Sequence, residues 1–214
     1  MCTFAKKKLM KEGIVQHAST LFLQYGFKSV TMDDLAESMR ISKKTLYAHF
    51  DNKQQLVREG SQFIFESACH EIETIKAASE HPIDEFYRVK SAMLKYFQNE
   101  SASPVYQLQK YYPEIYSMLK DQEFERLGGL VQSSLKTGIA TGLFRPNIDV
   151  EFVSRLYMNG MRGIRDIAVF PQADFDIKTL FESYLEYHAR AIVTAKGLAI
   201  LNNYIATANT NDEK

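Results

Sequence analysis

The sequence predicts an all-α protein of about nine helices, in which a head of three short helices precedes a longer helical body. Apolar residues recur at the spacing of a helix face along almost the whole chain, and prolines, glycines and capping residues separate the segments. No stretch alternates apolar and polar residues around a hairpin turn, as half-buried strands would. No heptad array reaches the length of a coiled coil.

Composition and charge narrow the class of protein. Of the 214 residues, 45% are hydrophobic and 24% are charged, which is ordinary for a globular chain and excludes a disordered one. The formal net charge is zero, so a globally basic nucleic-acid binder is excluded. However, residues 1–60 carry ten basic and six acidic side chains, and the rest of the chain carries the opposite excess. This imbalance favours a head that binds a polyanion.

The cellular compartment is expected to be reducing. The chain has two cysteines, Cys2 and Cys69, too few for a disulfide scaffold. No apolar run approaches the ~20 residues that span a bilayer. The basic N-terminal segment is not followed by the apolar stretch of a secretion signal. We therefore expect a soluble, cytoplasmic protein.

The first two helices of the head are delimited by strong local signals. Apolar residues share one face over 14–25, and Gly26 ends that helix. Thr31 is a typical N-cap, and the acidic pair Asp33 and Asp34 follows in the positive first turn of a second helix over 32–39.

A third and a fourth helix follow after a short turn. Ser42 caps a helix in which Leu46 and Phe50 face inward, and a longer helix spans 53–78. A turn of three to four residues between the second and third helices describes a helix-turn-helix unit. We therefore place a helix-turn-helix domain at residues 1–52 and a helical body at residues 53–214.

Prolines and N-capping residues delimit the predicted helices of the body. Asp149 caps a helix that ends before Pro171, and Asp174 or Asp176 caps a last long helix that runs to about residue 195 or beyond. The remaining expected segments are helices over 83–100 and 121–141, one that begins after the Ser103-Pro104 pair, and one that Pro113 starts or kinks.

The outer face of the third helix carries the chemistry that DNA recognition needs. Its amines, hydroxyl, phenol and imidazole suit contacts to phosphates and base edges. These side chains belong to Lys43, Lys44, Tyr47 and, with less support, Thr45 and His49. Lys53, at the start of the fourth helix, is placed to reach a phosphate together with the backbone N–H groups there.

The spacing of these residues resembles a known family. The chain reads Ala18-x-x-Leu21-Phe22-x-x-x-Gly26-Phe27-x-x-x-Thr31-x-x-x-Leu35-Ala36, then Ile41-Ser42-x-x-Thr45-Leu46-Tyr47-x-His49-Phe50-x-x-Lys53-x-x-Leu56. This pattern, over residues 9–57, is similar to the DNA-binding head of the tetracycline-repressor-like (TetR) transcription regulators. There are two departures. Arg40 stands where the family often has glycine, and Lys44 stands where it often has a small residue.

The resemblance implies a function and a set of DNA contacts. It implies a dimeric transcription regulator, in the main a repressor, that binds a palindromic operator in double-stranded DNA and is released by a small-molecule effector acting through the fourth helix. The implied DNA-binding residues are Thr31, Ser42, Lys43, Lys44, Thr45, Tyr47, His49 and Lys53. Thr31 also has a simpler interpretation as a helix cap that touches no DNA.

The resemblance also implies a homodimer built on two late helices, each with a broad apolar stripe. The alternative is that these stripes form the core of one chain. The expected interface residues are Leu156, Gly160, Gly163, Ile164, Leu180, Tyr184, Leu185, His188, Ala191 and Ile192.

An effector pocket is expected between the middle helices, where aromatic residues are dense. The alternative is that these residues are ordinary core and surface aromatics. The candidate lining residues are Phe86, Met93, Phe97, Tyr106, Tyr112, Tyr116, Phe124, Leu127, Met158 and Arg162.

Other classes find less support in the sequence. Cys69 and His70 are adjacent, so on a helix they point about 100° apart and cannot act as a nucleophile and base pair. Glu66, His70 and Glu73 share a helix face, but such a set is more often a solvated surface than a metal site. We expect no enzyme, cofactor or metal. The alternative function is a helical module that binds nucleic acid or a small molecule without operator specificity.

Overall fold

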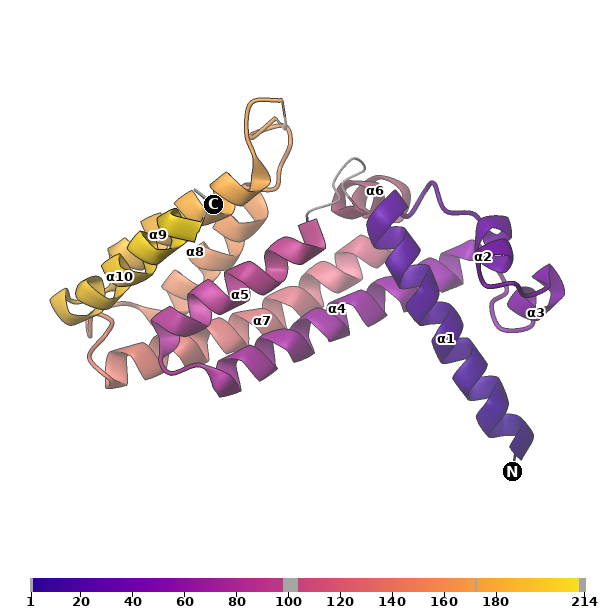
Figure 1. The fold of residues 1–214 in the computed structure, drawn as a ribbon, viewed down its shortest axis with the longest axis horizontal. Helices are drawn as coiled ribbons and strands as arrows, with labels where there is room; N and C mark the ends of the chain where they lie inside the picture. The colour runs from indigo at the N-terminus through magenta and orange to yellow at the C-terminus, as the bar shows by residue number, and fades with distance from the viewer. Residues whose placement is uncertain (1, 98–103, 172, 212–214) are drawn as a thin grey trace. The chain divides into compact units, whose positions relative to one another are not determined.

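The computed structural model describes residues 2–97, 104–171 and 173–211, which form ten α-helices (Figure 1). The all-α class is confirmed, and within the described residues the extended pairing is a single antiparallel bridge between Phe144 and Val193. The helices are α1 (Cys2–Tyr25), α2 (Met32–Ser38), α3 (Lys43–Tyr47), α4 (Lys53–Ala78), α5 (Pro82–Phe97), α6 (Pro104–Tyr111), α7 (Pro113–Ala140), α8 (Val150–Gly163), α9 (Ile177–Ile192) and α10 (Ala195–Asn211).

The helices are grouped into two compact units. The first comprises residues 1–70 and 96–123, and the second comprises residues 71–95 and 124–214. Helices α4, α5 and α7 contribute residues to both units. No helix among the described residues combines the length and the apolar character needed to cross a membrane.

The first unit packs α1, α2 and α3 around a common core, with α2 beside α3 (Figure 1). Most of the residues predicted to face inward are buried there, whereas Leu21 and Met39 are half-buried and Tyr25 is exposed. The buried ones are Ile14, Ala18, Phe22, Met32, Leu35, Ala36, Leu46 and Phe50, and Leu56 of α4 joins the same core. Gly60 of α4 lets α1 approach closely, because a Cβ at Gly60 would lie 3.1 Å from the Phe22 ring and the Ser19 hydroxyl donates to the Gly60 carbonyl at 3.1 Å.

The helix-turn-helix has the predicted caps. Thr31 and Asp34 form a reciprocal capping box at the start of α2, and the Ser42 hydroxyl accepts the Thr45 backbone N–H at the start of α3. The turn between the two helices puts Arg40 at a φ of 54°, in the left-handed region that favours glycine. Arg40, which departs from the family pattern, therefore has a strained backbone, and the strain energy is of order 1 kcal/mol. Helix α3 itself is short, since the chain leaves the helix after Tyr47 rather than near Phe50.

Helix α6 belongs to the first unit, where it lies against the end of α1 (Figure 1). Gln107 accepts the backbone N–H of Lys28 at 2.8 Å, and Leu108 is buried in the same core as the helix-turn-helix residues. Gly26 has a φ of 85°, and a Cβ there would lie 2.3 Å from the Gln107 amide nitrogen. The first compact unit thus extends beyond residue 52 and takes in a later part of the chain.

The second unit contains most of α5 together with α8, α9 and α10. Helix α9 lies between α8 and α10 and contacts both (Figure 1). The buried residues of the unit's core come from α5, α7, α9 and α10, from the turn after α7 and from the junction between α9 and α10, and Val153 and Tyr157 of α8 pack against them. The buried residues are Ile83, Phe86, Leu135, Leu143, Phe144, Leu185, Ala189, Ile192, Val193 and Leu201.

Two helix boundaries in this unit differ from the prediction. The expected last helix is interrupted at Val193, which is extended (ψ 153°), and α10 starts anew at Ala195. The backbone of Thr194 donates to Leu143 at 2.9 Å and that of Arg145 donates to Ile192 at 2.8 Å, so pairing with the turn after α7 replaces helical hydrogen bonds. Helix α8 ends at Gly163, and turns replace helix up to Pro171.

Another expected boundary is absent, because α7 begins at Pro113 and runs unbroken to Ala140, so the separate helix expected over 121–141 is the second half of α7. The caps agree with the prediction, since Asp149 and Asp176 cap α8 and α9. The expected end of α5 near residue 100 and the cap at Ser103 lie outside the described residues.

Candidate nucleic-acid interface

Helix α3 and the residues directly beside it carry six of the eight side chains predicted to contact DNA. Ser42, Lys43, Lys44 and Tyr47 are exposed, and Tyr47 keeps 49% of its surface accessible. Thr45 and His49 are half-buried. Leu46 and Phe50 are fully buried, so the helix is held from behind by apolar packing and shows its polar face to solvent. A rigid, solvated face of this kind suits contact with a groove of duplex DNA.

Lys43 is engaged by a residue that the sequence reasoning did not single out as its partner. Its Nζ lies 2.7 Å from Oδ2 of Asp33, on α2. This hydrogen bond and the charge of Asp33 raise the pKa of Lys43 above its ordinary value. The sequence predicts Asp33 only as a first-turn residue of α2. Asp33 and Lys43 are ten residues apart, and this separation does not reveal their contact unless the turn between α2 and α3 is known.

The start of α2 is a polar corner. The Asp34 carboxylate accepts the Thr31 backbone N–H at 2.8 Å, and the Thr31 hydroxyl accepts the Asp34 backbone N–H at 3.1 Å. The backbone bond from Thr31, followed by its side-chain bond, lowers the pKa of Asp34. Thr31 is exposed, so its hydroxyl can exchange its bond to the Asp34 carboxylate for a bond to a phosphate.

Lys53 is fixed at the start of α4. Its Nζ donates to the backbone carbonyl of Lys28 at 2.8 Å. Partial burial lowers the pKa of Lys53, while the negative charge of Asp34 acts in the opposite direction. An ammonium group has three donors, so this bond leaves others for a phosphate.

The residues predicted to line an effector pocket are spread over both units. Tyr112 and Tyr116 pack against the core of the first unit, and Tyr106 is exposed there. In the second unit Phe86 stacks on Phe144 at 5.8 Å, and the Arg155 guanidinium lies 4.7 Å from the centre of the Phe124 ring. Met158 is buried, whereas Met93, Leu127 and Arg162 are half-buried. The side chain of Phe97 lies outside the described part.

A surface hollow of about 410 Å³ lies in the second unit and involves none of those candidates. It is lined by Glu71, Ile75, Tyr87, Arg88, Ser91 and Ala92. The position of an effector site therefore stays a prediction.

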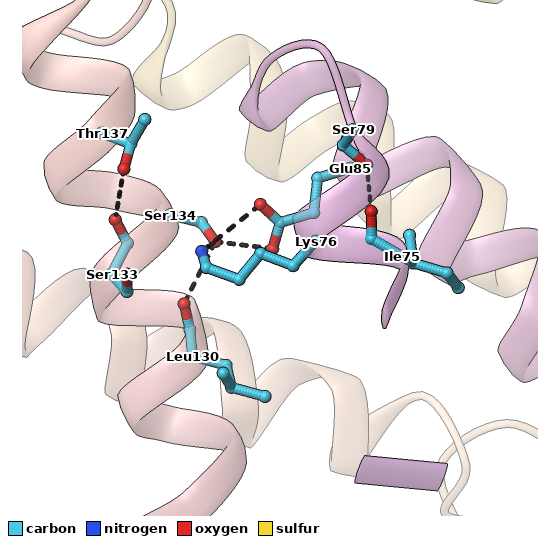
Figure 2. A network of polar contacts seen from close by, with 8 residues as sticks. All are labelled: Ile75, Lys76, Ser79, Glu85, Leu130, Ser133, Ser134 and Thr137. Carbon is cyan, nitrogen blue, oxygen red and sulfur yellow. Dashed lines mark hydrogen bonds and ion pairs between the residues drawn. The ribbon is translucent and has the colours of Figure 1, made fainter. Parts of the chain in front are cut away.

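The second unit also buries a charged network that the sequence did not reveal. Lys76 of α4, Glu85 of α5 and Ser134 of α7 point toward one another (Figure 2). Ser134 donates to Glu85 at 2.6 Å, and the Lys76 ammonium lies 3.5 Å from the same carboxylate. Glu85 and Ser134 are buried, so each depends on the others for its hydrogen bonds.

The predicted dimer residues divide into two faces of α9. Leu185, His188 and Ile192 are buried within the chain, whereas Ala191 is exposed and Leu180 and Tyr184 are half-buried. Ile164, just after α8, is buried. The exposed face also includes Tyr187, 74% accessible, which the sequence reasoning missed. A face on which 180, 187 and 191 recur at helical spacing is separate from the buried one, whereas Tyr184 is turned toward α8, where its hydroxyl donates to the carbonyls of Leu156 and Tyr157.

The two predicted interface glycines of α8 have different surroundings. A Cβ at Gly160 would lie 2.1 Å from the Tyr184 hydroxyl, so Gly160 serves the packing of α8 on α9 within the chain. A Cβ at Gly163 would meet nothing within 4 Å. The exposed apolar residues Phe152 and Leu156 share the outer face of α8 with Gly163.

His188 is a buried histidine without a hydrogen-bond partner at Nε2. Its ring packs 4.8 Å from that of Tyr157 and 6.2 Å from that of Tyr184. Burial lowers the pKa of His188 to about 4, so the ring is neutral at neutral pH.

Comparison with known proteins agrees with this geometry. Residues 14–59 match the family model described as "Bacterial regulatory proteins, tetR family". A stretch of 79 residues is 34% identical to the biofilm operon icaADBC HTH-type negative transcriptional regulator IcaR of Staphylococcus aureus. The match covers 37% of this chain and 42% of that protein, so the chain spans under half the length of this relative.

Similar solved structures cover most of the chain. A transcriptional regulator from Saccharomonospora viridis, crystallised in complex with choline, aligns with a TM-score of 0.70 at 15% identity over 87% of this chain and 99% of that one. A TetR-family regulator from Agrobacterium tumefaciens aligns with a TM-score of 0.69 at 17% identity, over 88% and 100% of the two chains. At these identities the likeness concerns the fold.

Proposed function

The chain belongs to the TetR family of transcriptional regulators, and on this premise we propose that it is a dimeric repressor that binds a palindromic operator and is released by a small molecule. The family is one of regulatory proteins, which sets the enzyme classes aside. The observation that carries the proposal is the face of α3, where Lys43, Lys44 and Tyr47 are exposed above a fully buried Leu46 and Phe50.

Operator contact divides into two kinds. Side chains of α3 enter the major groove, where amines and hydroxyls bond to base edges and to the phosphates beside them. Thr31 and Lys53 bind backbone phosphates on either side and set the register of the head. The basic excess of residues 1–60 supplies the attraction to DNA that does not depend on sequence.

The dimer uses the outer faces of α8 and α9. Phe152, Leu156 and Tyr187 leave more than half of their surfaces accessible, which favours a partner for this apolar face. A second copy provides that partner, since two-fold symmetric heads read the two halves of a palindrome. Leu185, His188 and Ile192 then support the interface from within each chain.

The effector binds in the second unit. Its aromatic interior, with Phe86, Phe144 and Tyr157 in a stack, resembles the walls of small-molecule sites. The choline complex of the S. viridis regulator supports a ligand-binding role for this fold. A shift of operator affinity requires that the effector bind one state of the dimer more tightly than the other.

Selection from a random duplex library at physiological salt tests the proposal. We expect an enriched inverted repeat, which the variant Lys43→Ala with Lys44→Ala fails to bind while remaining a folded dimer. Binding without enrichment would instead support a module that lacks operator specificity. Unchanged binding by the double variant would refute the assignment of α3 as the recognition helix.

A further inference from the structure

Helix α6 brings two tyrosines and a lysine to the edge of the helix-turn-helix. Lys28, in the loop between α1 and α2, places its Nζ 3.3 Å from the Tyr111 hydroxyl and 4.4 Å from the centre of that ring. Lys110 donates to the Tyr106 hydroxyl at 3.1 Å and lies 5.6 Å from the centre of the Tyr111 ring. These four side chains, which we call the α6 patch, are all exposed.

The positive charge of the α6 patch is not matched by carboxylates. Within the part of the chain that the structure describes, the side-chain partners of Lys28 and Lys110 are phenols and aromatic rings. The hydrogen bond to Tyr106 raises the pKa of Lys110, and the hydrogen bond from Lys28 lowers the pKa of Tyr111. The raised pKa of Lys110 keeps its amine charged, and two lysines side by side with aromatic partners make the patch attract anions.

The α6 patch continues the candidate DNA surface. Lys53 donates to the backbone carbonyl of Lys28 at 2.8 Å, so the patch begins where the predicted phosphate contact of Lys53 lies. Thr31 follows three residues after Lys28 on the same loop. Gln107 binds the backbone N–H of Lys28 at 2.8 Å and thereby holds α6 against this loop.

We propose that the α6 patch binds phosphates of duplex DNA that flank the bases read by α3. This inference rests on the proposed function, and it extends the DNA-contacting surface to a helix outside the helix-turn-helix. Lysine amines and tyrosine hydroxyls are phosphate donors in protein–DNA complexes. The patch is open and exposed, as suits a backbone that runs past it, whereas a small anionic ligand favours an enclosed site.

The experiment measures how operator affinity depends on salt for the full-length protein. Each neutralised phosphate contributes about 0.9 to the slope of log K against log salt concentration. We expect the variant Lys28→Ala with Lys110→Ala to lower this slope by about 2, with the ratio of operator to scrambled-duplex affinity unchanged. Lys120→Ala, an exposed lysine of α7 in the same unit, is the matched control and should leave the slope unchanged.

The outcomes separate this inference from the proposed function. An unchanged slope in the double variant, with operator preference intact, would overturn the inference and leave the proposed function standing. Absence of DNA binding by the unaltered chain would overturn both. If the double variant melts early, Lys110→Gln alone leaves the Lys28 loop untouched, and a drop of about 1 in slope is then expected.

Discussion

Lys43 and Asp33 form an ion pair across the two helices of the helix-turn-helix, with 2.7 Å between Nζ and Oδ2. The lysine that begins α3 thus holds a carboxylate before any phosphate arrives. Both side chains are exposed, so water and salt weaken the pair, and a phosphate can compete for the amine. The ion pair thus orients the Lys43 side chain, but the side chain remains free to leave Asp33 for a phosphate.

Asp33→Asn is therefore expected to tighten DNA binding. The substitution frees the Lys43 amine and removes a negative charge that faces the phosphates, so operator affinity should rise a few-fold at low salt. Stability should change little, because water and salt screen an exposed ion pair of this type. Fluorescence anisotropy on the selected operator measures the effect. Asp121→Asn, on an exposed part of α7, is the control, and weaker binding by Asp33→Asn would refute the competition.

Arg40→Gly is expected to stabilise the head. Arg40 has a φ of 54°, where a side chain with a Cβ costs about 1–2 kcal/mol. Part of that gain is offset because glycine has more freedom in the unfolded chain, so a net gain of about 1 kcal/mol is expected. Thermal unfolding measures it. Arg40→Ala keeps the Cβ and should give no gain; an equal gain in both variants would mean that the arginine side chain, rather than its backbone, is unfavourable.

Leu156→Glu is expected to give a folded monomer. Leu156 is 51% accessible on α8, so a charge there leaves the core of the chain intact but is buried when two copies meet. Sedimentation velocity and circular dichroism measure mass and helix content together. Leu9→Glu, on an exposed position of α1, should remain dimeric. Leu185→Glu does not discriminate, because Leu185 is core and the charge would unfold the chain. A dimeric Leu156→Glu protein would contradict the proposed interface.

Stability is expected to fall as the pH drops from about 6.5 toward 4. The ordinary pKa of histidine is 6.5, and that of His188 in the folded chain is about 4. The unfolded chain therefore binds a proton in this window that the folded chain does not, so the free energy of unfolding rises with pH there. The full effect is about 3 kcal/mol, since one pKa unit corresponds to about 1.4 kcal/mol.

His188→Phe separates this effect from the carboxylates. The variant keeps a ring against Tyr157 and Tyr184 but cannot take up a proton, so urea unfolding between pH 4 and 6.5 should become flatter. Asp34, Asp84 and Asp176 have lowered pKa values and lose their stabilising contribution mainly below their ordinary value of 3.8. A pH dependence that is identical in the variant would exclude His188 as its source.

The head was largely predictable from sequence because its signals are local. Thr31 and Ser42 cap helices within three residues of themselves, and the inward faces of Leu46 and Phe50 follow from helical spacing alone. The body was less predictable. The break at Val193 depends on backbone pairing with residues 143 and 145, some fifty positions earlier, which no local pattern reveals.

The candidate sites show the same division. The sequence shows the apolar stripe of α9. Because this stripe is broad, it covers two faces of the helix, and the sequence alone does not tell which face packs against the helix's own chain. Only the packing around Phe181, Leu185 and Ile192 assigned one face to the core and left Tyr187 and Ala191 outside. The aromatic residues of the middle helices were likewise visible, whereas their separation into two units was not.

The sequence by itself determined the all-α class, the caps and the face of α3, because these depend on residues within about one helical turn of each other. The tertiary structure decided which distant side chains meet. Asp33 holds Lys43, α6 brings Lys110 toward Lys28 through Tyr111, and Lys76 joins Glu85 and Ser134 inside the second unit. Such contacts join different elements of the chain, and their partners are selected by the packing of the whole unit rather than by helical spacing within one element.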